Sequence, residues 1–154
     1  MDYALLEQQV RELLRGEPDH LANAANFAAF LYQEIPDLNW AGFYYADPSG
    51  ELVLGPFQGR PACARLPGGR GVCGAALTSR SVIVIDDVGA FADHIVCDAA
   101  SRSELAVPLE ADGEAYGVFD LDSPRLARFG AGDRDGIVRL VKAFTESVAP
   151  PAWR

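Results

Sequence analysis

Three cysteines are the side chains of this sequence best suited to covalent chemistry. Cys63, Cys73 and Cys97 lie in or beside predicted loops, where a reactant can reach a thiol. Free cysteine is among the most buried residue types, so three small hydrophobic side chains are the first interpretation. The local sequence favours reactive thiols instead, because glycines beside Cys73 permit close backbone approach and polar residues surround Cys97.

A zinc site is the second interpretation of the cysteines, because together with His94 they would offer a metal four ligands. Structural zinc sites usually contain two cysteines separated by about two to four residues. Here only His94 and Cys97 lie that close in the sequence. The spacing therefore argues against zinc, and we predict no metal site.

Two aspartates form the next group. On an extended strand over residues 116–122, Asp120 and Asp122 point to the same face as Tyr116 and lie about 7 Å apart, while the residues between them face the core. Taken alone, this pattern indicates aspartates that face solvent, as on most alternating strands.

Glu104 lies on the preceding predicted strand, and the hairpin register decides whether it joins the two aspartates. A two-residue turn at Asp112-Gly113 places Glu104 opposite Leu121, on the wrong face. A three-residue loop, or a bulge near Pro108, places Glu104 opposite Asp120. Three clustered carboxylates repel one another unless a cation or a shared proton relieves them, so such a cluster suits a ligand ammonium.

Aromatic residues supply candidate walls for a pocket. Trp40 and Tyr44 share one face of a predicted strand over 39–45, and Phe43 and Tyr45 share the other. If the first face lines a pocket, the indole offers a plate for a methyl-sulfur group and a cationic centre, and Tyr44 offers a hydroxyl. On the pattern alone, core aromatics are an equal alternative.

The elements that must position these residues follow from the hydrophobic period. Helical spacing predicts helices over 3–14, from Pro18 to Pro36 and around 137–144. A period of two predicts strands, of which 81–85 is expected to be buried; the strands cover 39–45, 51–54, 81–85, 104–109 and 116–122. A short strand at 63–66 and a short helix opening at 71–77 complete the pattern, which indicates an α+β domain with a mostly antiparallel sheet.

The stretch 86–102 has no sustained period, and a long ordered loop in a small domain is usually functional. Its four aspartates are typical of turns and caps, and we leave them outside the predicted site: Asp86, Asp87, Asp93 and Asp98. We expect one domain over 1–154, with N-terminal helices in 1–36, the sheet and pocket loops in 37–123 and a C-terminal helix in 132–149.

Charge and composition exclude several classes of protein. The 22 acidic and 13 basic side chains give a formal net charge of −9, which argues against binding to nucleic acid or an anionic membrane. The 49% hydrophobic content suffices for one core. The amino end has neither the basic start nor the apolar run of a signal peptide, so we expect a cytoplasmic protein whose cysteines do not form structural disulfides.

Five short segments together resemble the free methionine-(R)-sulfoxide reductases, which are single GAF domains. The resemblance covers nearly the whole chain and is carried by LGPFQG at 54–59, GRGVCG at 69–74, HIVCD at 94–98, Ser103-Glu104 and GVFDLDS at 117–123. It implies a central antiparallel sheet with helices on both sides and a pocket covered by loops. It also implies an oxidoreductase that reduces free L-methionine (R)-sulfoxide without a bound cofactor.

The same resemblance assigns roles to the cysteines. Cys97 would attack the sulfoxide sulfur and become a sulfenic acid, Cys63 would resolve it to a disulfide, and Cys73 would be a second candidate for resolution. Thioredoxin or another dithiol would restore the thiols. These assignments leave open which thiol resolves first and what the pKa of Cys97 is.

Substrate binding would, by the resemblance, involve Glu104, Asp120 and Asp122 with Trp40 and Tyr44. Crowding raises the pKa of at least one carboxyl, which could then protonate the departing oxygen. The same negative field works against a thiolate at Cys97. His94 could offset the field, although anchoring the loop is its favoured role.

Two other functions compete with the reductase: a GAF sensor that binds a small ligand without catalysis, and a thiol redox switch without a substrate. A chain of this size has no room for an attached output domain, which argues against the sensor. The N-terminal helices could pack against a second copy of the chain as a homodimer.

Overall fold

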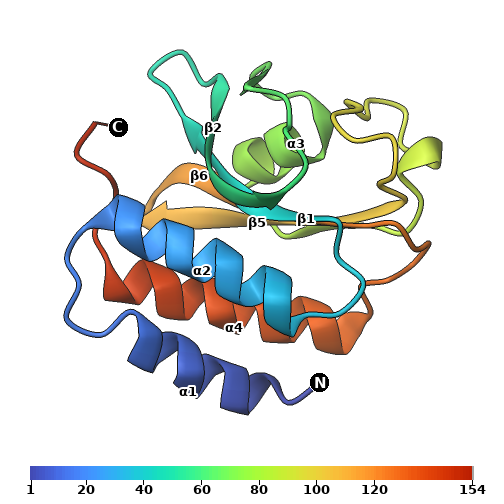
Figure 1. Cartoon of the computed structure of the whole chain (residues 1–154). Helices are drawn as coiled ribbons and strands as arrows, with labels where there is room; N and C mark the ends of the chain where they lie inside the picture. The colour runs from blue at the N-terminus through green and yellow to red at the C-terminus, as the bar shows by residue number, and fades with distance from the viewer. Residues whose placement is uncertain (154) are drawn as a thin grey trace.

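A six-stranded antiparallel sheet lies at the centre of the computed structural model, which describes residues 1–153 (Figure 1). The strand order is β3-β2-β1-β6-β5-β4, and the α+β prediction is confirmed. The strands are β1 (Trp40–Ala46), β2 (Leu52–Gly59), β3 (Arg65–Leu66), β4 (Ile83–Ile85), β5 (Ser103–Ala111) and β6 (Glu114–Ser123). The helices are α1 (Tyr3–Leu13), α2 (His20–Glu34), α3 (Gly71–Ser79) and α4 (Ala131–Ser147), with a 3₁₀ turn at Val88–Ala90.

The N-terminal helices begin at capping aspartates. The carboxylate of Asp2 accepts a hydrogen bond from the backbone N–H of Leu5, and that of Asp19 accepts one from Ala22. Pro36 follows the end of α2, as its sequence predicts. No helix of residues 1–153 is both long and apolar enough to cross a membrane.

Three of the helices form two layers below the sheet. α2 and α4 cover one face of the sheet, and α1 packs beneath them, away from the strands (Figure 1). The core between these helices and the sheet is built on aromatic rings, including Phe27, Phe43, Phe119 and Phe144, each of them fully buried. Alternation along β1 and β6 sends Phe43 and Phe119 to the helical side, where they meet Phe27 of α2 and Phe144 of α4.

The opposite face of the sheet carries α3 and the long loop over 86–102 (Figure 1). A second apolar cluster lies there, and it contains Trp40, Tyr44, Val118, Val72 and Cys73. Both faces of β1 are therefore buried. The two interpretations of Trp40 and Tyr44 are both correct, because these rings pack in a core and also line a cavity.

Two strands differ from the prediction in extent or burial. The predicted strand 81–85 is β4, which is shorter and half-buried because it pairs only with β5 and lies at the edge of the sheet. β2 continues through Pro56, beyond the predicted 51–54. The register of β1 and β2 shifts between Gly42 and Tyr44, so Pro56 lies at an irregular point of the ladder, where a missing N–H is tolerated.

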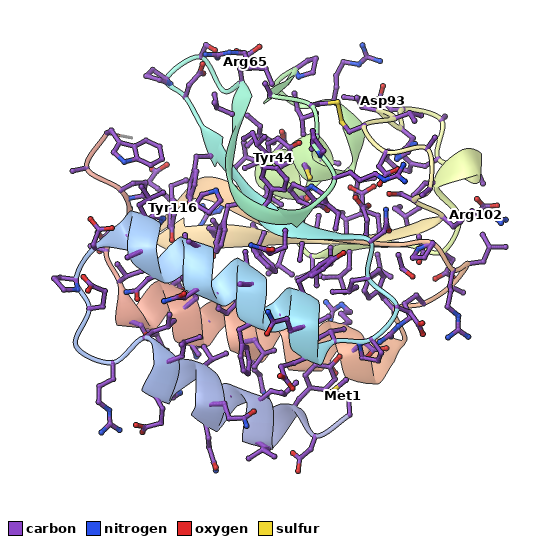
Figure 2. All side chains as sticks on the ribbon, in the orientation of Figure 1. Met1, Tyr44, Arg65, Asp93, Arg102 and Tyr116 are labelled. Atoms are coloured by element: carbon purple, nitrogen blue, oxygen red, sulfur yellow. A yellow bond between two sulfur atoms is a disulfide. The ribbon has the colours of Figure 1, made fainter. Side chains whose placement is uncertain are left out.

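The β5–β6 hairpin has a two-residue turn followed by a bulge. Asp112 and Gly113 both have positive φ values, 52° and 79°, as the turn requires. The register shifts after Leu109, which leaves Tyr116 without an opposite residue and turns it to the helical side. The predicted placement of Tyr116 on the face of the aspartates is therefore wrong (Figure 2).

Candidate active site

The hairpin bulge places the carboxyl groups together. Because it shifts the register, Glu104 lies on the face of the aspartates, as a bulge near Pro108 predicts, but opposite Asp122 rather than opposite Asp120. Across the next strand pair, Asp122 lies opposite Trp40. Glu104, Asp122 and Trp40 are therefore cross-strand neighbours on one face of β5, β6 and β1. Asp120 is the next residue of β6 on the same face, two positions before Asp122.

The carboxyl groups lie away from solvent. Glu104 is 6% exposed and Asp120 is 5% exposed, so the interpretation of these strand acids as solvent-facing is wrong. Burial, and then repulsion by Asp122, raises the pKa of Glu104 to about 8. Burial, and then repulsion by Glu104, raises the pKa of Asp120. Burial, and then repulsion by Asp120, raises the pKa of Asp122. At neutral pH Glu104 therefore carries a proton.

Stacked rings form one wall beside the carboxyls. The ring of Trp40 stacks on Tyr44 with centroids 5.7 Å apart and on Phe57 with centroids 5.5 Å apart. A Cβ at Gly42 would lie 2.6 Å from the indole of Trp40 and 2.4 Å from Cβ of Phe57, so glycine is needed at this position. The hydroxyl of Tyr44 donates a hydrogen bond to the carbonyl oxygen of Cys63 at 2.8 Å.

A disulfide joins Cys63 to Cys97, with an S–S distance of 2.06 Å and Cα atoms 5.3 Å apart. It links the loop before β3 to the long loop over 86–102. Figure 2 shows the bond above the sheet, beside the labelled Asp93. The four-ligand zinc set considered for the three cysteines and His94 is not formed, because two of the thiols are bonded to each other.

Polar contacts anchor the loop that carries Cys97. Asp93 accepts hydrogen bonds from the guanidinium of Arg70 at 2.7 Å and from the backbone N–H of Gly71 at 3.0 Å. After Cys97, the amide of Asn39 donates to Asp98 and to Ser101, both at 3.0 Å. The loop is therefore fixed to the N-terminus of α3 and to the residue before β1.

His94 faces the carboxyl cluster. Its Nε2 lies 3.5 Å from Oε2 of Glu104, which is long for a hydrogen bond. Burial lowers the pKa of His94, and the pKa of Glu104 is raised, so at neutral pH this contact joins two uncharged groups. His94 therefore lies over the carboxyls without forming an ion pair with them.

Cys73 is the free thiol, and it lines the cavity from α3. It is 4% exposed, and its Sγ lies 3.9 Å from Oε1 of Glu104. Burial, followed by repulsion from Asp120 and Glu104, raises the pKa of Cys73 well above its usual value. Cys73 is therefore a protonated thiol at neutral pH, which makes it a poor nucleophile in this state.

These groups surround a cavity of about 40 Å³. Every predicted site residue except Cys63 lines it, and Cys63 is joined to it through the disulfide. Two buried polar atoms of lining residues, Nε1 of Trp40 and Oδ1 of Asp120, have no hydrogen-bond partner within residues 1–153. Such atoms in a polar cavity are expected where a ligand binds.

Sequence reasoning missed three polar residues of this region. Asp98 and Ser101 line the cavity, and Asn39 holds both of them. Asp98 resembles a turn residue in the sequence, and it also caps a turn through the N–H of Ala100. The place of Asp98 in the wall of the cavity depends on a contact with Asn39, 59 positions away, which no local pattern indicates.

Comparisons with known proteins agree on one family. The family model for the GAF domain matches residues 10–149. The free methionine-R-sulfoxide reductase of Escherichia coli (strain K12) is 46% identical over 152 residues, which are 99% of this chain and 92% of that protein.

Two solved structures share the fold at similar identity. A free methionine-R-sulfoxide reductase from Neisseria meningitidis, solved in complex with its substrate, is 43% identical with a TM-score of 0.90, over 94% of this chain and 87% of that one. A protein from Burkholderia vietnamiensis described as a GAF sensor is 53% identical with a TM-score of 0.90, over 95% of this chain and 92% of that one.

Proposed function

The chain belongs to the free methionine-R-sulfoxide reductases of the GAF domain family, and from this membership we propose that it reduces free L-methionine (R)-sulfoxide to L-methionine. The observation that carries the proposal is the disulfide between Cys63 and Cys97 at the edge of a cavity floored by buried carboxyl groups. Each turnover oxidises two thiols to this disulfide and releases methionine and one water molecule.

In the first step, Sγ of Cys97 attacks the sulfoxide sulfur. The sulfur–oxygen bond of the substrate breaks, its oxygen ends on Cys97 as a sulfenic acid, and methionine leaves. The thiol loses its proton and the transferred oxygen gains one, so the step needs an acid beside the oxygen. The position of Cys97 in the wall of the cavity supports this role.

Glu104 is the acid that we propose for this step. It is protonated at neutral pH because burial raises its pKa to about 8. A general acid works best when its pKa lies near the working pH, which Glu104 satisfies. His94, uncharged and 3.5 Å away, places no positive charge beside Glu104 that would lower the pKa of this carboxyl.

The remaining carboxyls bind the substrate's ammonium group. An ammonium ion favours ionisation of Asp120 and Asp122, whose mutual repulsion it relieves, and it offers a donor to the unpartnered Oδ1 of Asp120. The indole of Trp40 packs against the methyl-sulfur end. A residue inside a peptide has no ammonium to place here, so we expect peptide-bound sulfoxide to be excluded.

In the second step, the Cys63 thiol attacks the Cys97 sulfenic acid, which forms the disulfide and releases water. The hydrogen bond from Tyr44 to the carbonyl of Cys63 holds the backbone of the attacking residue beside the cavity. Thioredoxin or another dithiol then reduces the disulfide by thiol exchange, which fits a reducing, cytoplasmic compartment.

The test is consumption of racemic free methionine sulfoxide driven by dithiothreitol, followed by chiral chromatography. Wild type should consume only the R form, and Cys97→Ser should consume neither form. The exposed Val96→Ala, next in sequence, is the matched control and should retain activity. If folded, reduced wild type consumes neither form, or if Cys97→Ser is as active as wild type, the proposal is wrong.

A further inference from the structure

Three buried donors converge beneath the cavity from three different elements. Cys73 on α3, Glu104 on β5 and Asp120 on β6 each offer one ligand atom, and these atoms all lie within 4.8 Å of one another. All three side chains are at least nine-tenths buried. None of them takes part in the disulfide, so the cluster exists in the oxidised protein.

The charges around this cluster leave it without a cation. Asp122 lies on the same face and adds a fourth acidic group. Among the described residues that line the cavity, the basic side chains are Arg70, which is paired with Asp93, and His94, whose pKa is lowered. Burial first, and then repulsion among the acidic groups, raises the pKa of each donor.

One atom of the cluster lacks any partner. Oδ1 of Asp120 is buried and accepts no hydrogen bond from residues 1–153, and the whole residue is only 5% exposed. A buried carboxylate oxygen without a donor loses its hydration, and no hydrogen bond compensates for that loss of free energy. A metal ion would coordinate this carboxylate and neutralise the repulsion at the same time.

We propose that Cys73, Glu104 and Asp120 form a binding site for a thiophilic divalent cation such as Zn²⁺. Sγ of Cys73 and one carboxylate oxygen from each acid would be the protein ligands, with water at a fourth position. Zinc–sulfur and zinc–oxygen bond lengths place sulfur and oxygen ligands roughly 3.5 to 3.8 Å apart. Sγ of Cys73 lies 3.9 Å from Oε1 of Glu104, so this pair is nearly in position.

The donor set selects the class of metal. A thiolate ligand favours Zn²⁺, Co²⁺ or Cd²⁺ over Mg²⁺ and Ca²⁺, which prefer all-oxygen sites. When the metal binds, the donor groups release their protons to solvent. The site itself does not depend on the proposed reductase activity. If that function is correct, the ion and the substrate's ammonium would compete for the same acids.

Cobalt absorption on the oxidised protein tests the site directly. The chain has three cysteines, and two of them form the disulfide, so Cys73 is the one thiol able to give sulfur-to-cobalt charge transfer. Adding Co²⁺ to wild type should produce a near-ultraviolet charge-transfer band and visible tetrahedral bands that saturate at one ion per chain. Zn²⁺ should abolish both sets of bands.

Three variants assign the ligands. Cys73→Ala should lose the charge-transfer band, and Asp120→Asn, which keeps the side-chain shape, should weaken Co²⁺ binding at least tenfold. The exposed Asp86→Asn is the matched control and should bind as wild type does. Circular dichroism confirms folding of each variant. Absence of the bands in folded, oxidised wild type, or their persistence in Cys73→Ala, would overturn the proposal.

Discussion

Replacing Glu104 with glutamine should make the protein more stable, and increasingly so as the pH rises. The pKa of Glu104 is raised from 4.5 to about 8 in the folded state by burial and by Asp122. Between these values the folded protein keeps a proton that the unfolded chain has released. The free energy of unfolding of wild type therefore falls as the pH rises through this window, and the variant lacks that contribution.

The magnitude follows from the two pKa values. At 1.36 kcal/mol per pKa unit, the contribution of Glu104 falls by about 4 kcal/mol between pH 5 and pH 9. This is an upper limit, because the structure can relax around an ionised group. The difference in unfolding free energy between Glu104→Gln and wild type cancels the groups whose pKa does not depend on Glu104. Asp120 and Cys73, whose pKa values Glu104 raises, do not cancel.

Urea unfolding of the oxidised proteins, followed by tryptophan fluorescence at pH 5 and pH 9, measures this difference. We expect the advantage of Glu104→Gln over wild type to grow by several kcal/mol between the two pH values. The exposed Glu114→Gln, on the same hairpin, is the control and should keep the wild-type pH dependence. Parallel pH profiles for Glu104→Gln and wild type would refute the assignment of a buried, protonated carboxyl.

Three further predictions concern the packing at Gly42, the hydrogen bond of Tyr44 and the proton on Glu104. In Gly42→Ala the new methyl group would lie 2.4 Å from Cβ of Phe57, so we expect a loss of about 1–3 kcal/mol in urea unfolding. Tyr44→Phe removes the hydrogen bond to the carbonyl of Cys63 and should slow disulfide closure about fivefold in stopped-flow measurements, with the sulfenic acid accumulating. kcat/KM of wild type should fall about tenfold per pH unit above pH 8, as Glu104 loses its proton; a flat profile to pH 10 would exclude it as the acid.

Local patterns in the sequence predict most of the elements. Helical spacing locates α1 and α2, and alternation locates β1 and β6. The same alternation correctly places Phe119 in the core and Asp120 on the opposite face. The family resemblance is likewise carried by short segments whose order is visible without a structure.

Features that depend on pairing between distant residues could not be predicted. The sequence allows a bulge near Pro108, but it does not fix the bulge after Leu109, which reverses the face of Tyr116 and sets Glu104 opposite Asp122. The apolar run 81–85 predicts a strand, but its place at the edge depends on the order of the other strands. The burial of Asp120 depends on α3 and the long loop, which cover that face.

A single turnover without added reductant tests whether reduction of the sulfoxide closes the disulfide between Cys63 and Cys97. Fully reduced wild type is mixed with excess free L-methionine (R)-sulfoxide, the methionine is quantified, and the disulfides are mapped by mass spectrometry of unreduced peptides. We expect one methionine per chain and one new disulfide, between Cys63 and Cys97, with Cys73 still a thiol. Methionine formed without this disulfide, or no methionine from folded and reduced protein, would contradict the account.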